Sequence, residues 1–488
     1  MVLARNASAV LATATMFYFG TGLHPVWWLV WFAPIPVLLV AMSMSGRMAF
    51  ALGALAFLGG MLNFWTYMHG VIGIPIGIIA SIFLIPSVAF GLSVILWRAL
   101  VRRGLCWLAA LAMPVVWVSY EFISSSTSPH STFGSIAYSE IDFLPVVQVA
   151  AVTGLAGITF LLMLVPAAIA TRQRMPVAGA LAILALVLAW GGFRLSRTPA
   201  SPSIQVGLAS SDDGPNIFPS KGPAIQRAAE QYASEVRRLA GAGAQLVVIP
   251  EKLAKAIGDD ARLFDAPLAA AAAQSHVELA AGVERWTPAV KRNEVRMFAP
   301  TGEVEALYEK HHMLPPFESH LQVGTDRLTL QRPSGKWGVT ICKDMDFPKL
   351  SREYGNDGVG LLIVPAWDFV MDGWLHDRMA VMRGVESGLT IVRAAKQGYL
   401  TVSDDRGRVL AEQQTGASPF ASLLAAAPVR HSATIYAAWG DWFAWLNLAA
   451  LAALMAGEII RVWRRRRLPA SSPAPPTNPT ARPPEPRP

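Results

Sequence analysis

The sequence has little charge and almost no cysteine. Charged residues make up 15% of its 488 positions and hydrophobic residues 53%, whereas a soluble globular domain usually carries about 25% charged residues. The shortage of charge argues against a purely soluble chain and against a disordered one. Two cysteines, Cys106 and Cys342, are too few for a disulfide scaffold or a cysteine-rich zinc site.

Several catalytic and binding motifs are also missing from the polar part of the chain. It contains no Gly-rich phosphate loop, no pair of histidines four residues apart and no Gly-x-Ser-x-Gly turn. These absences disfavour nucleotide-binding, zinc-protease and serine-hydrolase functions. We expect neither a metal ion nor an organic cofactor.

The apolar residues are concentrated in long runs at the two ends of the chain. Because a helix needs about 20 apolar residues to cross the hydrocarbon core, we expect residues 1–193 to hold seven transmembrane helices and residues 434–460 an eighth. The first run is short and also fits a signal peptide, but the runs behind it favour a retained span. The predicted spans are Ser8–Thr21, Val26–Met44, Met48–Met68, Val71–Trp97, Leu105–Tyr120, Leu144–Ala170, Val177–Gly192 and Thr434–Ile460.

The net charge of +8 arises from arginines that flank the apolar runs. Every second connection is basic, which is the positive-inside pattern of a multi-pass membrane protein. It predicts a cytoplasmic N-terminus, a cytoplasmic basic cluster after the last span, and a segment Phe193–Ser432 on the opposite side. Membrane topology therefore accounts for the basic composition, and we expect no nucleic-acid partner. The flanking arginines are Arg5, Arg47, Arg98, Arg102, Arg103, Arg172, Arg174, Arg461 and Arg464–Arg467.

Residues 199–432 contain most of the acidic residues and are long enough for one domain with its own core. Short apolar runs alternate there with helical patterns, which predicts an α/β fold with polar residues at strand ends. The predicted strands are Gln245–Pro250, Val277–Val283, Val295–Pro300, Gly338–Cys342, Gly360–Pro365 and Leu389–Ala394. The predicted helices are Ala224–Leu239, Ala261–Gln274 and Trp374–Val385. Residues 468–488, rich in Pro, Ser, Ala and Thr, are expected to form a disordered cytoplasmic tail.

Three polar residues follow apolar strands and together form a chemically coherent set. Glu251 can take the proton of the Cys342 thiol when its sulfur attacks a carbonyl carbon. The Lys310 ammonium and the backbone N–H of Lys343 can stabilise the resulting oxyanion. Glu318 is the candidate carboxylate that keeps Lys310 charged and oriented. Taken singly, each of these residues would more often be structural.

The order of these residues along the chain, together with the short sequence motifs around them, favours catalytic over structural roles. Ile249-Pro-Glu251, Tyr308-Glu-Lys-His-His-Met-Leu-Pro-Pro-Phe-Glu318 and Cys342 after an apolar strand resemble the Glu-Lys-Cys triad of the nitrilase superfamily. With the many-span N-terminal region and the single C-terminal span, residues 1–462 resemble the membrane-embedded branch of that superfamily, the apolipoprotein N-acyltransferase family.

This resemblance implies a nitrilase-like αββα sandwich set on a multi-pass α-helical membrane bundle. It implies an acyltransferase in which Cys342 takes an acyl chain from a phospholipid as a thioester. The chain is then transferred to the N-terminal amine of a diacylglyceryl-cysteine lipoprotein. The expected location is the bacterial cytoplasmic (inner) membrane, with the catalytic domain on the periplasmic side.

The sequence departs from the family pattern beside the expected catalytic residues. Lys343 and Asp344 follow Cys342, where the family often has an aromatic residue and a glutamate, and Lys252 follows Glu251 directly. These changes keep a second function open, a membrane-tethered amidase or nitrilase that hydrolyses an extracytoplasmic C–N bond. A third, a polytopic binding protein with an inactive domain, is disfavoured because all the triad positions are present.

Other residues near the motifs allow two interpretations. His311 and His312 can border the reaction pocket or only pack beside Lys310. Trp367 is a candidate pocket residue that can equally belong to the core. Cys106 is expected at the cytoplasmic end of the fifth span, where it would be a packing residue that cannot reach Cys342.

Overall fold

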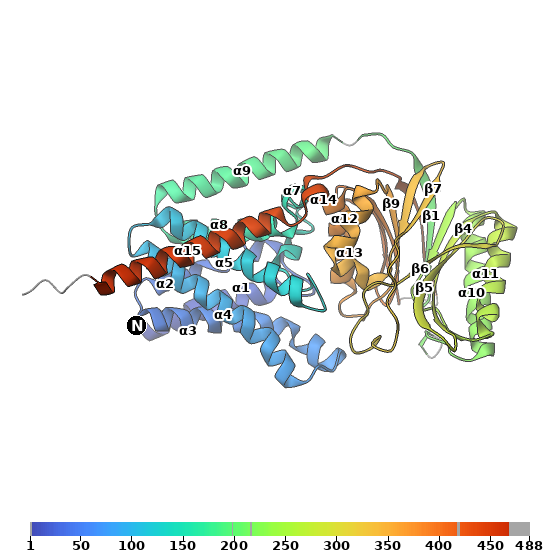
Figure 1. The fold of residues 1–488 in the computed structure, drawn as a ribbon, viewed down its shortest axis with the longest axis horizontal. Coiled ribbons are helices and arrows are strands. Elements are labelled where there is room, and N and C mark those ends of the chain that lie inside the picture. Colours follow the sequence, from blue (N-terminus) through green and yellow to red (C-terminus); the bar gives the residue numbers. More distant parts are fainter. Residues whose placement is uncertain (1, 198, 215–216, 417–419, 468–488) are drawn as a thin grey trace, which may run out of the picture.

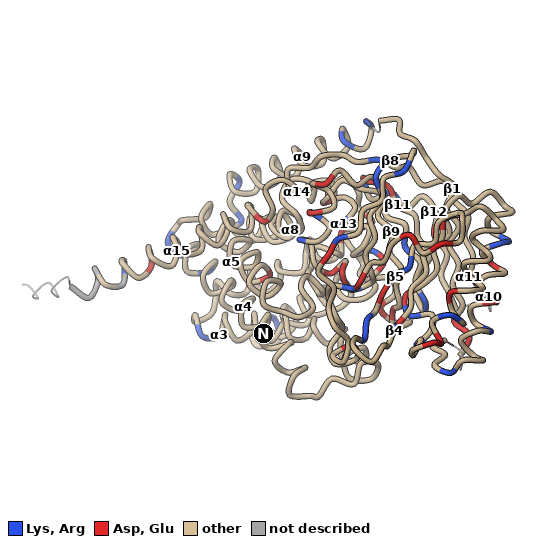
Figure 2. The backbone as a smooth tube through the Cα atoms, turned by 45° about the vertical axis from the view of Figure 1, so that its right-hand side comes forward, with Lys and Arg blue, Asp and Glu red and all other residues tan. Residues whose placement is uncertain are grey.

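The computed structural model describes residues 2–197, 199–214, 217–416 and 420–467. A helical bundle from the N-terminal part of the chain lies beside a layered α/β domain, and the last helix returns along the bundle (Figure 1). Lys, Arg, Asp and Glu are concentrated in the α/β domain, while the bundle is largely free of them (Figure 2). The predicted tail, 468–488, lies outside the described residues.

The bundle contains long apolar helices together with short, broken ones. By length and composition, five helices of the described chain can cross a membrane: Gly46–Phe64, Ile76–Val101, Cys106–Thr127, Arg174–Ser196 and Trp442–Arg461. The helices of the bundle are α1 (Val2–Gly20), α2 (Ile35–Ala41), α3 (Gly46–Met61), α4 (Ile76–Val101), α5 (Cys106–Thr127), α6 (Leu144–Val147), α7 (Ala150–Thr153), α8 (Leu155–Ala170), α9 (Arg174–Ser196), α14 (Ile435–Trp439) and α15 (Trp442–Arg467).

The prediction of uninterrupted helices was wrong for some of the apolar runs. In Val26–Met44 only α2 is α-helical, preceded by a short 3-10 turn. Leu144–Ala170 is divided into α6, α7 and α8, with Gly154 at φ 64° between the last two. A Cβ on Gly154 would lie 2.4 Å from the Tyr436 ring, so close packing of α14 accompanies this break. The C-terminal run is likewise interrupted at Gly440, where φ is 63°.

The α/β domain is built on two sheets that face each other. In the described chain one sheet has seven strands, in the order β13-β1-β2-β4-β5-β6 with β3 beside β4, and the other has six, β12-β11-β10-β9-β8-β7. The strands are β1 (Ser203–Ser210), β2 (Leu246–Ile249), β3 (Lys255–Ile257), β4 (Glu278–Trp286), β5 (Lys291–Phe298), β6 (Val304–Glu309), β7 (Leu328–Arg332), β8 (Gly335–Val339), β9 (Leu361–Trp367), β10 (Thr390–Lys396), β11 (Tyr399–Ser403), β12 (Val409–Gln414) and β13 (Ala421–Pro428).

Apolar side chains of the two sheets meet in a common core, for example Val206 and Val248 from one sheet and Ile363 from the other. Helices α10 (Gly222–Gly241) and α11 (Asp260–Ser275) cover the outer face of the first sheet. Helices α12 (Pro348–Asn356) and α13 (Gly373–Ser387) cover the second sheet and lie next to the bundle (Figure 1). The αββα sandwich on a helical bundle is thus confirmed. Each predicted strand and helix of this domain has a counterpart, with ends shifted by a few residues.

Helix α13 packs on the sheet and on the bundle at once. Its Leu375, Met379 and Met382 belong to the same apolar core as the bundle helices. Arg383 is fully buried, pairs with Glu386 at 3.0 Å and donates to the Tyr138 hydroxyl at 2.9 Å. The other oxygen of Glu386 accepts the Leu155 backbone N–H at the start of α8, at 3.1 Å. The ion pair of α13 therefore joins the α/β domain to the bundle.

We predict that Glu386→Ala destabilises the protein strongly. The substitution leaves the Arg383 guanidinium buried without its carboxylate, a change that typically costs about 3–5 kcal/mol. Thermal unfolding of the detergent-solubilised protein should show a clearly lower midpoint. Glu230→Ala, at an exposed position of α10, should leave the midpoint nearly unchanged, and equal midpoints for the two variants would contradict the interpretation.

Candidate active site

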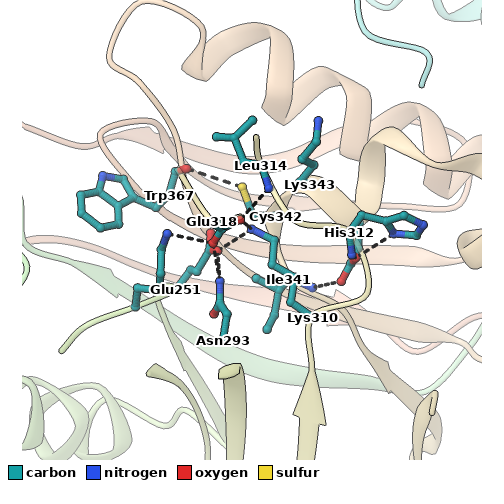
Figure 3. Close-up of polar contacts among 12 residues, drawn as sticks. Glu251, Asn293, Lys310, His312, Leu314, Glu318, Ile341, Cys342, Lys343 and Trp367 are labelled. Carbon is teal, nitrogen blue, oxygen red and sulfur yellow. Dashed lines mark hydrogen bonds and ion pairs between the residues drawn. The ribbon is translucent and has the colours of Figure 1, made fainter. Parts of the chain in front are cut away.

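The residues singled out from the sequence meet where strands of both sheets end (Figure 3). Glu251 follows β2 and Lys310 follows β6, in the first sheet. Cys342 lies shortly after β8, and Trp367 is the last residue of β9, in the second sheet. Glu251, Lys310 and Cys342 all line one cavity between the two sheets and the bundle.

The Lys310 ammonium lies between two buried carboxylates. Its Nζ donates to Glu251 Oε1 at 2.8 Å and to Glu318 Oε2 at 2.7 Å, and all three side chains are at most 2% exposed. Asn293 bridges the same carboxylates, donating to Glu251 Oε1 at 2.6 Å and to Glu318 Oε1 at 2.8 Å. Lys252 Nζ also donates to Glu318 Oε1, at 2.8 Å.

Local backbone structure brings these side chains together. The Lys310 N–H donates to the Asn293 carbonyl at 2.9 Å, which extends the β5–β6 pairing by one residue and places the two side chains together. After Lys310 the chain turns back, and the backbone N–H of Leu314 donates to Glu318 Oε2 at 2.9 Å. The spacing of Lys310 and Glu318 in the sequence thus corresponds to one closed loop.

Cys342 does not belong to a strand, contrary to the prediction of Gly338–Cys342. Strand β8 ends at Val339, and Cys342 opens a short 3-10 helix, Cys342–Asp346, with φ 41°. A non-glycine residue in the left-handed region costs about 1–3 kcal/mol and is frequent at functional sites. The half-buried Sγ donates to the Trp367 carbonyl at 3.5 Å.

Asp344 fixes the Cys342 turn to the loop that carries Lys310. Its Oδ1 accepts the backbone N–H groups of His311 and His312 at 3.2 and 2.9 Å. Its Oδ2 accepts the Ile341 N–H at 3.0 Å and the Tyr308 hydroxyl at 2.7 Å. The aspartate is fully buried, so it acts as a structural tie between two segments of the site.

The histidines after Lys310 pack away from the reaction cavity. His312 stacks on Phe347, with ring centroids 3.7 Å apart, and its Nδ1 lies 3.0 Å from Asp344 Oδ1. His311 lies against Tyr308, with ring centroids 5.2 Å apart. Neither histidine is among the described residues that line the cavity, so of the two interpretations for His311 and His312 the structure favours packing, whereas Trp367 does line the cavity.

Burial and neighbouring charges determine the protonation of the site. Burial raises the pKa of the Cys342 thiol, and the Glu251 carboxylate raises it further against the opposing effect of Lys310. Burial would lower the pKa of Lys310, but Glu251 and Glu318 outweigh it and raise that pKa well above its usual value. Burial likewise opposes ionisation of Glu318, yet the two lysines hold its pKa low. At neutral pH the thiol is protonated and Lys310 is charged, so attack by the sulfur requires a base.

Lys343 begins a polar chain that runs from the site into the bundle. Its Nζ donates to Asp346 Oδ2 at 2.8 Å and lies 3.1 Å from His130 Nδ1. His376 connects Asp346, at 3.6 Å, to Asp372, at 3.0 Å. Asp372 in turn accepts the hydroxyl of Tyr67, a bundle residue, at 2.5 Å.

The charges along this chain alternate. Burial opposes the positive charge of His376, but Asp372 and Asp346 raise its pKa to about 10. Burial and the Lys343 ammonium lower the pKa of His130 to about 4, so this ring is neutral and can accept from Lys343. Lys343, the residue directly after Cys342, is therefore held by the bundle as well as by its own domain.

The cavity has a polar end and an apolar compartment, with a volume of about 1280 Å³. The polar end contains Glu251, Lys310 and Cys342. The compartment is walled by bundle residues of α3, α4, α5 and the connection after α3. Its apolar lining includes Phe57, Met61, Phe64, Met68, Ile78, Ile82, Ile85, Trp117 and Val118. A hydrocarbon chain that occupied this compartment would have a polar end group near Cys342.

The sandwich and the site define a membrane-associated protein with a nitrilase-type catalytic domain. Residues 214–440 match the carbon-nitrogen hydrolase family, and residues 8–168 match the apolipoprotein N-acyltransferase N-terminal domain. Similar curated proteins include apolipoprotein N-acyltransferases of Geobacter metallireducens, 25% identical over 88% of this chain and 90% of the relative, and of Gloeobacter violaceus, 28% identical over 90% and 92%. The chain is therefore similar to apolipoprotein N-acyltransferases over about nine-tenths of its length.

Solved structures resemble about half of this chain. An amidase from Nesterenkonia sp. is 18% identical, with 48% of this chain and 93% of that chain covered and a TM-score of 0.41. Nit3 of Saccharomyces cerevisiae, a nitrilase-superfamily member, is 22% identical, with 46% and 90% covered and a TM-score of 0.39.

Reasoning from the sequence missed several residues of this site. Asn293 lies inside strand β5 and carries no motif, so nothing in its neighbourhood distinguishes it from other polar strand residues. His130 and His376 reach Lys343 and Asp346 from distant parts of the chain. A single sequence gives no signal for such contacts, because they depend on how the bundle and the domain pack.

We predict that Asp344→Asn lowers the reactivity of Cys342 by at least about tenfold. An amide nitrogen would face at least one of the donors that Asp344 accepts, which breaks the tie between the Cys342 turn and the Lys310 loop, and an unmade buried hydrogen bond costs about 1–3 kcal/mol. The rate of Cys342 alkylation in the folded protein measures the effect. Asp326→Asn, an exposed aspartate of the neighbouring loop, is the matched control, and similar rates for both variants would refute the assigned role.

Proposed function

We propose that the protein transfers an acyl chain from a phospholipid to the N-terminal amine of a diacylglyceryl-cysteine lipoprotein, through a thioester on Cys342. The observation that carries this proposal is the shared cavity, in which Cys342, Lys310 and Glu251 adjoin an apolar compartment walled by the bundle. An enzyme that hydrolyses small soluble amides has no need of such a compartment. The similarity to apolipoprotein N-acyltransferases supports the same acceptor class.

In the first half-reaction Glu251 takes the proton of Cys342 while the sulfur attacks the carbonyl carbon of the acyl ester. The described hydrogen bonds to the Glu251 side chain reach Oε1, so we assign Oε2 to the thiol proton. Lys310 and the backbone N–H of Lys343 stabilise the oxyanion. The ester C–O bond then breaks, the proton on Glu251 passes to the departing oxygen, and a lysophospholipid leaves a thioester behind.

In the second half-reaction the α-amine of the lipoprotein attacks the thioester carbonyl. Glu251 takes a proton from the attacking nitrogen, the C–S bond breaks, and Glu251 returns this proton to the departing Cys342 sulfur. A thioester remains reactive enough to acylate an amine, so no further activation is needed. Glu318 keeps Lys310 charged and aimed throughout, because it accepts from the same ammonium as Glu251 does.

The alternative of a membrane-tethered amidase or nitrilase rested on Lys343 and Asp344. Asp344 is fully buried and bonded to the Lys310 loop, and Lys343 is bonded to Asp346. Both residues thus have structural partners that account for them without a different substrate. The similarity to acyltransferases over about nine-tenths of the chain also favours transfer over hydrolysis.

The protein is a membrane protein, and its bacterial relatives point to the inner membrane. We propose that the described helices within residues 1–193 and 434–460 form the membrane part, with the domain of residues 199–432 on the periplasmic side. The arginines at alternate connections support this orientation. The apolar compartment walled by α3, α4 and α5 would then lie in the membrane part, beside the lipids that supply the acyl chain.

We predict that the protein forms an acyl adduct that requires Cys342. Membranes incubated with a phospholipid labelled in its acyl chains should yield labelled protein, and hydroxylamine should release the label because it cleaves thioesters. Cys342→Ala should abolish the adduct, while Cys106→Ala should retain it. Cys342-dependent release of ammonia from amides without any adduct would favour the hydrolase, and full activity of Cys342→Ala would refute the mechanism.

The orientation makes a separate prediction. A reporter that functions only outside the cytoplasm should be active when fused after Arg197 and inactive when fused after Arg467. A cytoplasmic reporter should show the reverse pattern. Opposite results would place the catalytic domain in the cytoplasm and exclude the proposed acceptor encounter on the periplasmic side.

A further inference from the structure

Lys252, the residue after Glu251, has a contact that the proposed reaction steps leave unused. Its Nζ donates to Glu318 Oε1 at 2.8 Å, and its side chain is 15% exposed where it borders the cavity. Glu318 thus offers one oxygen to Lys252 and the other to Lys310. The two lysines hold the carboxylate from opposite oxygens, which fixes its orientation more tightly than Lys310 alone would.

The backbone of Lys252 is held in an unusual conformation by a second lysine. Its φ is 47°, in the left-handed region that non-glycine residues rarely occupy. Its carbonyl accepts a hydrogen bond of 2.8 Å from Lys396 Nζ, which also donates to the Ile217 carbonyl at 2.9 Å. Lys396 is buried, with its Nζ 3.6 Å from the centroid of the Trp367 ring. Such strain persists only where the surroundings enforce it, and here it directs the Lys252 side chain toward Glu318.

The ion-pair cluster that shares the cavity with Cys342 is balanced only when Lys252 is counted. Two carboxylates, Glu251 and Glu318, alternate with two ammonium groups, Lys310 and Lys252, along a chain of ion pairs. The other charged pair that acts on the thiol is neutral in itself, because Arg393 binds both oxygens of Asp368 at 3.0 and 2.6 Å.

Lys396 adds one more ionisable group to these surroundings. It faces Lys252 together with Glu251 and Asp212, and burial, followed by the Lys252 charge, lowers its pKa well below the usual value. Its tendency to lose the proton leaves Lys252 as the cation that offsets the second carboxylate. Removing the Lys252 charge would give the cluster an excess negative charge, and a like charge opposes formation of a thiolate.

We propose that Lys252 is a positioning residue, which orients Glu318 for Lys310 and neutralises the charge cluster so that the Cys342 sulfur ionises more easily. This inference rests on the proposed role of Cys342 as the nucleophile. It concerns the residue that follows the proposed base, Glu251, directly in the sequence.

The test is the pH profile of Cys342 alkylation by iodoacetamide, measured on the full-length protein in nanodiscs with Cys106→Ala as the background. For Lys252→Met the midpoint of the profile should move up by about one pH unit, as expected when a cation near a thiol is lost. Alkylation below the midpoint should fall by about tenfold. Lys252→Arg retains the charge and should restore most of the wild-type profile.

Two further variants separate charge from packing. Lys252→Gln keeps a hydrogen-bond donor for Glu318 but lacks the charge, so its midpoint should move like that of Lys252→Met even if the methionine variant folds poorly. Lys255→Met removes a cation that lies over the Trp286 ring, at 3.5 Å from its centroid and outside the described cavity lining. Its profile should match the wild type.

The outcomes distinguish this inference from the proposed function. Superimposable profiles for wild type, Lys252→Gln and Lys252→Met would overturn the role of Lys252, whatever the acyl-adduct experiment gives. A shift of equal size in Lys255→Met would also overturn it, because any nearby cation would then suffice. A protein that forms no Cys342 adduct but shows the predicted shift would sustain the electrostatic role and refute the acyl transfer.

Discussion

A buried ammonium group between two buried carboxylates is the constraint on which the site depends. Lys310 loses its hydration on folding, and Glu251 and Glu318, at 2.8 and 2.7 Å, compensate for it. Removing one partner of such a cluster leaves a charge without compensation in a medium of low polarity. Three features hold these groups in place: the β5–β6 pairing, the closed loop after Lys310 and the Asn293 bridge. The Cys342 sulfur therefore lies near charged groups whose positions are already fixed in the folded protein.

The second requirement is that a lipid-derived group and a charged pocket meet in one place. Helix α13 provides this junction, since it covers a sheet on one side and joins the apolar core of the bundle on the other. The polar chain from Lys343 through Asp346, His376 and Asp372 to Tyr67 crosses the same boundary. Two folding units that each have their own core therefore complete a single cavity.

The sequence was most informative where local chemistry decides the structure. Strand periodicity predicted the α/β fold, and the resemblance to the nitrilase superfamily implied the sandwich. The polar residues at strand ends, Glu251, Lys310 and Cys342, line one cavity. It was less informative about backbone breaks, because an apolar run such as Leu144–Ala170 has the same composition whether or not it is interrupted at Gly154. Contacts between distant segments, such as His130 with Lys343, leave no periodic pattern and could not be predicted. The prediction of Cys342 as a strand residue failed because a strained turn follows β8.

The hydrogen bond between Asp372 and Tyr67 bears on how the protein can be divided for study. A fragment that begins after the seventh apolar run would retain the whole sandwich but would lose Tyr67 and His130 together. Asp372 and Lys343 would then be solvated differently, and the face of α13 that carries Leu375 and Met382 would be left bare. Such a truncated domain would be prone to self-association through that face. Preparations intended for crystallography or screening should therefore retain the helices of the N-terminal region.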